Sequence, residues 1–75
     1  MTQETVDKLI EYRNRNRLIY ARSYNGLENQ IVTLYVGCDG TYYVENGGRT
    51  INQFTQPAIA IDAYNKLIHP QHRLK

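Results

Sequence analysis

Apolar and polar residues alternate along two short segments in the middle of the chain, residues 31–36 and 41–45. Both are rich in the β-branched and aromatic residues that suit a pleated surface, so they predict two strands. Because side chains of a strand point alternately to opposite faces, one face of this pair is expected to be core. That face carries Val32, Leu34, Val36, Tyr42 and Val44. The opposite face carries Thr33, Tyr35, Thr41, Tyr43 and Glu45.

Glycines mark the turns beside these strands. Asp39 and Gly40 are residue types favoured at the centre of a two-residue hairpin turn, where both positions need positive φ. Residues 46–48, Asn-Gly-Gly, predict a second turn. Residues 49–54 can then return as a further short strand.

The N-terminal segment has helical periodicity. Val6, Leu9 and Ile10 repeat at i, i+3 and i+4, which predicts a helix from residue 3 to residue 13 or 14 with Thr2 as its N-cap. Residues 18–24 then predict a strand with two orientations open. Either Leu18, Tyr20 and Arg22 or Ile19, Ala21 and Ser23 face inwards.

A second helix is predicted near the C-terminus. Pro57 suits the first helical position, with Thr55 or Gln56 near the cap, and Pro70 ends the helix. Residues 71–75 are expected to be a frayed basic tail. The apolar side of the helix, expected to pack on the sheet, carries Ala60, Ile61, Tyr64, Leu67 and Ile68.

Together these elements predict an α+β fold. An N-terminal helix, an antiparallel sheet of three to four strands and a C-terminal helix packed on the sheet form one small domain over residues 1–75. A chain of 75 residues has room for one small core, and enclosing a large cofactor would be difficult. The hydrophobic content of 41% and the charged content of 21% are typical of a folded chain.

Location is predicted from what the sequence lacks. No apolar run approaches the roughly 18 to 20 residues of a membrane span, and the N-terminus lacks the basic-then-apolar plan of a secretory signal. The single cysteine cannot form an internal disulfide, which agrees with a reducing compartment. We expect a cytoplasmic protein without a membrane partner.

Candidate chemistry is sparse. Cys38 has no visible base to activate it, and Pro70 separates His69 from His72 and breaks the helix that would align them as metal ligands. The carboxylates are scattered, and no phosphate-binding or dinucleotide motif is present. We expect no catalytic activity, no cofactor and no metal.

Tyrosines and arginines are the candidate recognition residues. The chain has seven tyrosines, and tyrosine concentrates at recognition surfaces, although each can equally pack with its hydroxyl reaching water. The basic cluster Arg13, Arg15 and Arg17, followed by Arg22, suits phosphate or carboxylate groups. Its alternative is a solvated helix C-terminus, where cations offset the dipole.

One part of the sequence resembles a known family of domains. Residues 40–44, Gly-Thr-Tyr-Tyr-Val, followed by residues 54–65, Phe-Thr-Gln-Pro-Ala-Ile-Ala-Ile-Asp-Ala-Tyr-Asn, are similar to the three-strand-plus-helix DNA-binding domains of phage-integrase arm-binding and plant ethylene-response proteins. The resemblance covers roughly half the chain and implies that the exposed sheet face reads the major groove with arginines and aromatic residues. This sequence departs from that pattern, because Glu45 adds a repulsive charge and only Arg22 and Arg49 are strand-region arginines.

Three hypotheses of function follow. The first is a non-catalytic protein-binding module, of the kind that phages and mobile elements use as regulators or inhibitors, since the helix-sheet-helix plan also looks like that of some anti-CRISPR proteins. The second is a nucleic-acid-binding module, with affinity that falls steeply with salt. The third is a homodimer that buries the outward tyrosines, by edge pairing of strands for example. The predicted partner-binding residues are Arg13, Arg15, Arg17, Arg22, Thr33, Tyr35, Thr41, Tyr43 and Arg49.

Overall fold

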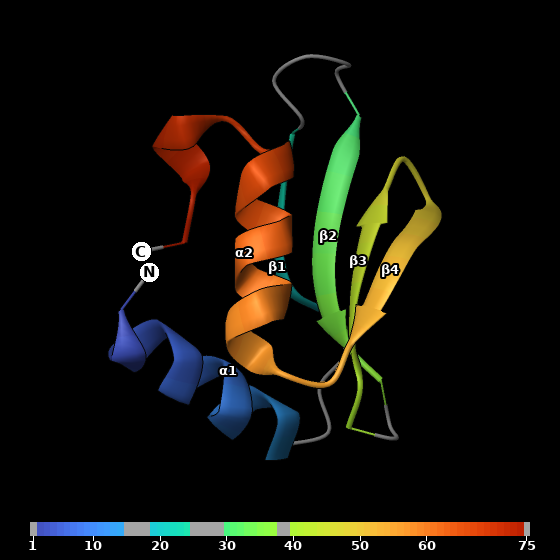
Figure 1. Ribbon diagram of the computed structural model, residues 1–75. Helices are drawn as coiled ribbons and strands as arrows, with labels where there is room; N and C mark the ends of the chain where they lie inside the picture. The colour runs from blue at the N-terminus through green and yellow to red at the C-terminus, as the bar shows by residue number, and fades with distance from the viewer. Residues whose placement is uncertain (1, 15–18, 25–29, 38–39, 75) are drawn as a thin grey trace.

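The computed structural model describes residues 2–14, 19–24, 30–37 and 40–74, without the side chains of Asn14 and Ile51. It contains an N-terminal helix, a four-stranded antiparallel sheet and a C-terminal helix, so the predicted α+β class is confirmed (Figure 1). The elements in chain order are α1 (Gln3–Asn14), β1 (Ile19–Tyr24), β2 (Ile31–Val36), β3 (Tyr42–Asn46), β4 (Arg49–Phe54), α2 (Pro57–Leu67) and the short 3-10 helix η1 (Pro70–His72).

The sheet has the order β1-β2-β3-β4, and both long helices lie on one side of it (Figure 1). Helix α2 packs on β2, β3 and β4, and α1 packs on α2. The shortest extent of the molecule is 16 Å, which is room for one sheet and one layer of helices. The buried core between these layers consists of Leu9, Val32, Leu34, Val36, Tyr42, Val44, Ala60, Ile61, Tyr64 and Ile68.

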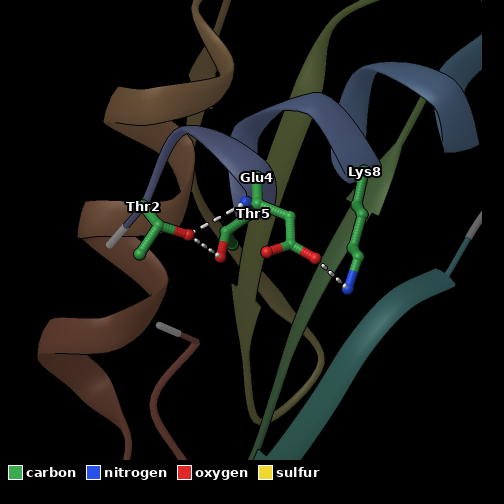
Figure 2. A network of polar contacts seen from close by, with 4 residues as sticks. All are labelled: Thr2, Glu4, Thr5 and Lys8. Atoms are coloured by element: carbon green, nitrogen blue, oxygen red, sulfur yellow. Dashed lines mark hydrogen bonds and ion pairs between the residues drawn. The ribbon is translucent and has the colours of Figure 1, made fainter.

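The first helix begins as the sequence predicts. The hydroxyl of Thr2 accepts a hydrogen bond from the backbone N–H of Thr5 at 3.3 Å, which satisfies one of the free donors of the first turn (Figure 2). Glu4 and Lys8 form an exposed ion pair at 3.3 Å one turn further on (Figure 2). Leu9 anchors the helix, because its side chain is completely buried.

The two hairpin turns differ in length. Gly47 and Gly48 have φ values of 62° and 86°, and they form the two-residue turn, with Asn46 paired to Arg49. The predicted two-residue turn at Asp39 and Gly40 is wrong in length. The N–H of Gly37 donates to the carbonyl of Thr41, so three residues lie between the paired positions, of which only Gly40 is among the described residues.

Strand β1 combines the two orientations left open by the sequence. Ile19 pairs with Tyr35 but Ala21 pairs with Leu34, so the register shifts by one residue between them. Ala21 consequently faces the core, while Ile19 lies on the opposite face and is 46% exposed. Tyr20 also packs partly against the core. Leu18 and residues 25–29, between β1 and β2, lie outside the described residues.

Residues 71–74 pack against the rest of the molecule, which corrects the expectation of a frayed tail for this part of it, while Lys75 lies outside the described residues. The side-chain amide of Asn65 donates to the carbonyl of Leu74 and accepts from its N–H, both at 2.9 Å. The Nε of Arg73 donates to the carbonyl of Asn65 at 2.8 Å, and Leu74 packs partly buried against the core. Pro70 does interrupt the helical path, since α2 ends at Leu67 and η1 begins at Pro70. Neither long helix in the described part of the chain is long and apolar enough to cross a membrane.

Candidate protein-interaction surface

The face of the sheet opposite α2, here called the outer face, is built from three rows of side chains. Each row follows the pairing from β1 through β2 to β3, and paired residues point to the same side of a sheet. The backbone N–H of Gly47 extends the first row by donating to the carbonyl of Ile31 at 2.9 Å. The rows are Tyr24, Ile31 and Gly47; Arg22, Thr33 and Glu45; and Ile19, Tyr35 and Tyr43.

Exposed apolar side chains gather at the β1 and β2 end of this face. Among the described residues the large hydrophobic side chains with high exposure are four, and three of them are on the outer face: Ile19 at 46%, Tyr24 at 60% and Ile31 at 42%. The fourth, Ile59, is on α2. Single exposed apolar residues are ordinary, but a group of them on one open sheet face is typical of an interaction surface.

Tyr35 and Tyr43 form the centre of the third row. Their rings stack with centroids 5.3 Å apart and planes 18° apart, so each ring limits the rotation of the other. Desolvation raises the pKa of the Tyr35 hydroxyl, the neighbouring Glu45 carboxylate raises it further, and Thr50 acts in the opposite direction. The stacked pair therefore presents a flat aromatic surface, on which the Tyr35 hydroxyl stays protonated at neutral pH.

The middle row carries one charge of each sign. Arg22 is exposed on β1 and Glu45 lies on β3, and Thr33 on the intervening strand separates them. Since neighbouring strands are about 4.8 Å apart, the two backbones are roughly 10 Å from each other. Arg22 forms no ion pair with any other described residue.

A depression runs along the outer face and has a volume of about 730 Å³. The residues that line it come from all three rows, together with Gln30 and Gly48. At the Gly48 end the depression is open, since no atom lies within 4 Å of where a Cβ of Gly48 would be, whereas the side chain of Gln30 lies over Gly47. The depression thus extends from β1 across β2 to Glu45 on β3, and Tyr24 is not among the residues that line it.

The predicted arginines do not share this surface. Arg22 is on the outer face, whereas Arg49 pairs with Asn46, whose partner on β2 is the buried Val32, and so it leaves the sheet on the helix side. Arg13, at the end of α1, places its guanidinium 5.8 Å from the ring centroid of the buried Tyr42. Arg15 and Arg17 lie outside the described residues.

The other predicted residues divide in the same way. Thr33, Tyr35 and Tyr43 are on the outer face, each half-buried by its neighbours. Thr41 precedes β3, and its carbonyl accepts the hydrogen bond from Gly37 at 2.7 Å, so it belongs to the turn. The prediction omitted Ile19, Tyr24 and Ile31. For Ile31 the signal was available, since the residue before the inward Val32 must point outwards.

Among the described residues there is no group of three His, Cys, Asp or Glu side chains that could hold a metal ion. The rings of His69 and His72 are 6.0 Å apart beside η1. Cys38 lies outside the described residues. The outer face has a depression, exposed aromatic side chains and one residue of each charge, which are features suited to binding.

The comparisons with known proteins do not indicate a family for this chain. No family model, no curated protein and no solved structure matches the chain.

Proposed function

We propose that this chain is a non-catalytic protein-binding module and that its outer face is the binding surface. The observation that carries the proposal is the position of Ile19, Tyr24 and Ile31, which are exposed together on a sheet face that no described element covers. Hydrophobic and aromatic side chains beside a concave region supply the anchors that protein interfaces use.

The charges of the same face favour a protein over a nucleic acid. Phosphate binding needs several cations on one surface, and the outer face has Arg22 beside the opposing charge of Glu45. Arg13 and Arg49 are directed elsewhere. The finer form of the proposal is a regulator or inhibitor encoded by a phage or other mobile element, and it stays a prediction.

A photocrosslinking experiment tests the proposal. A benzophenone amino acid replaces Tyr24 on the outer face or, as the matched control, Ile59 on α2, which is exposed to a comparable degree at 49%. In native extract we expect a discrete protein adduct from position 24 alone, and its loss when Ile31→Glu is added.

Three outcomes decide the matter. An adduct with the expected dependence on Ile31 supports the proposal, and a second copy of the chain counts as a protein partner. An adduct that nuclease removes would support the nucleic-acid hypothesis instead. Equal adducts from both positions, or none from either, would overturn the proposal.

A further inference from the structure

The three rows of the outer face are complementary to themselves. Consider a two-fold axis that lies between two facing sheets and runs parallel to β2. It places β1 of one copy opposite β3 of the other, and β2 opposite β2. Each residue of β1 then meets the β3 residue of its own row in the partner copy. The match can therefore be read row by row.

In the first row, shape is complementary. Among the described residues Tyr24 is the most exposed large hydrophobic side chain, at 60%, and it would face the end of the depression formed by Gly47, Gly48 and Gln30. Gly48 beside it has no atom within 4 Å of where a Cβ would lie, so that end of the depression is open to an aromatic ring.

In the middle row, charge is complementary. Arg22 of each copy would face Glu45 of the other, which gives two ion pairs related by the axis. Within one chain β2 lies between the two residues, and Arg22 forms no ion pair with another described residue. A buried or partly buried arginine at an interface needs such a partner.

In the third row, apolar and aromatic surfaces meet. Ile19, 46% exposed, would face Tyr43, and the Tyr35 rings of the two copies would approach each other at the axis. Sheets packed with nearly aligned strands lie about 10 Å apart, a distance that side chains of this size fill.

We propose that the partner of the outer face is a second copy of this chain, in a face-to-face dimer with its two-fold axis along β2. This rests on the proposed function, because it names the occupant of the same surface. The axis along β2 is selected by the charges, since it sets Arg22 against Glu45. An in-plane axis across the strands would set β1 against β1 and leave both charges unpaired.

Charge exchange between the two positions tests the dimer. Sedimentation of the full chain is measured from about 1 µM to about 1 mM, and the mass is expected to rise toward that of two chains. Arg22→Glu alone or Glu45→Arg alone creates two like-charge contacts, and each is expected to raise the dissociation constant at least about tenfold. Mixing the two variants, or combining both substitutions in one chain, restores opposite charges and is expected to restore association.

Matched variants exclude general effects of charge and of truncation. Arg49→Glu makes the same charge change as Arg22→Glu on the helix side and is expected to leave association unchanged. Tyr24→Ala is expected to weaken association, and Ile59→Ala to leave it unchanged. Circular dichroism confirms that each variant is folded, and if Arg22→Glu does not fold, the comparison of Tyr24→Ala with Ile59→Ala decides in its place.

Two results would overturn the dimer. One is a wild-type chain that is monomeric over the whole concentration range, and the other is a double variant that associates no better than the single ones. If the chain is monomeric while position 24 still crosslinks to another protein, the proposed function stands and only the identity of the partner is wrong.

Discussion

Among the described residues with a shifted pKa, Tyr64 is the most deeply buried. Its side chain is 1% exposed between α2 and the sheet, and burial raises its pKa to about 12. The neutral phenol is therefore held in the core well above the pH at which an exposed tyrosine ionises, near about 10. The Tyr64 ring therefore adds apolar area to the core, and its ionisation lowers the stability of the protein at high pH.

The stability of the protein should consequently fall in alkaline solution. Between about pH 10 and about pH 12 the unfolded chain loses a proton that folded Tyr64 keeps, so the free energy of unfolding decreases by about 1.4 kcal/mol for each pH unit. Urea unfolding at about pH 10, 11 and 12 measures this slope. Tyr64→Phe removes the group and should show a shallower decline.

Tyr20 and Tyr35, whose pKa values are also raised, remain in both proteins, so the difference between the two slopes isolates Tyr64. An equal slope in the Tyr64→Phe variant would assign the alkaline loss of stability to other groups.

The fold was predictable at residue level where one pattern allowed one answer. Val32, Leu34 and Val36 alternate with polar residues, and all three are buried. Around residue 19 the sequence offers Leu, Ile and Tyr in succession, so hydrophobicity alone fits both faces. The register shift in β1, which exposes Ile19, depends on pairing with β2 and cannot be read from one strand.

Among the elements, the segment after α2 differs most from expectation. Composition favoured a frayed tail because residues 71–75 are polar or basic apart from Leu74. The segment is held by two hydrogen bonds between the side chain of Asn65 and the backbone of Leu74. Such a contact depends on a polar side chain, so hydrophobic periodicity cannot predict it.

Asn65→Ala tests the contribution of this contact. The substitution removes two hydrogen bonds in a partly buried position, and we expect the free energy of unfolding to fall by about 1–2 kcal/mol. Asp62→Ala on the same helix removes only an exposed ion pair with Lys66 at 3.8 Å and should cost less than about 0.5 kcal/mol. Chemical denaturation of the two variants measures both values, and equal losses would mean that Asn65 contributes nothing specific.

At the scale of the whole molecule, the architecture places two strands inside the sheet and two at its edges. β2 and β3 have neighbours on both sides and are also packed against α2. β4 is an edge, and the N–H of Gln53 is satisfied by the side chain of its neighbour Asn52 at 2.8 Å. Such a local bond covers one of the free donors through which edge strands associate.

Hydrogen exchange should reproduce this division. The amides of β2 and β3 are expected to exchange most slowly, through global unfolding, and the outward amides of β4 faster, through local opening. Exchange measured by NMR at neutral pH distinguishes them. If the amide of Gln53 is as protected as those of β3, the edge has a partner in solution, which would point to strand pairing in place of the face-to-face dimer.

The interaction surface as a whole was less predictable than the fold. Period-2 alternation correctly placed Thr33, Tyr35 and Tyr43 on one face. It could not show that Arg22 joins them while Arg13 and Arg49 do not, because that depends on how separate elements are arranged in space. The cytoplasmic location and the absence of catalysis stay predictions.

The turn at Gly47 also affects how the protein ages. An asparagine followed by glycine is prone to deamidation. The backbone nitrogen of the glycine attacks the side-chain amide carbon, ammonia leaves, and water opens the resulting cyclic imide to aspartate or isoaspartate. In the folded chain the N–H of Gly47 is held by the carbonyl of Ile31, and Asn46 is fixed at the end of β3. We therefore expect Asn46 to deamidate more slowly in the folded hairpin than in the unfolded chain, and mass spectrometry of a stored sample would detect the reaction as a gain of one mass unit at that residue.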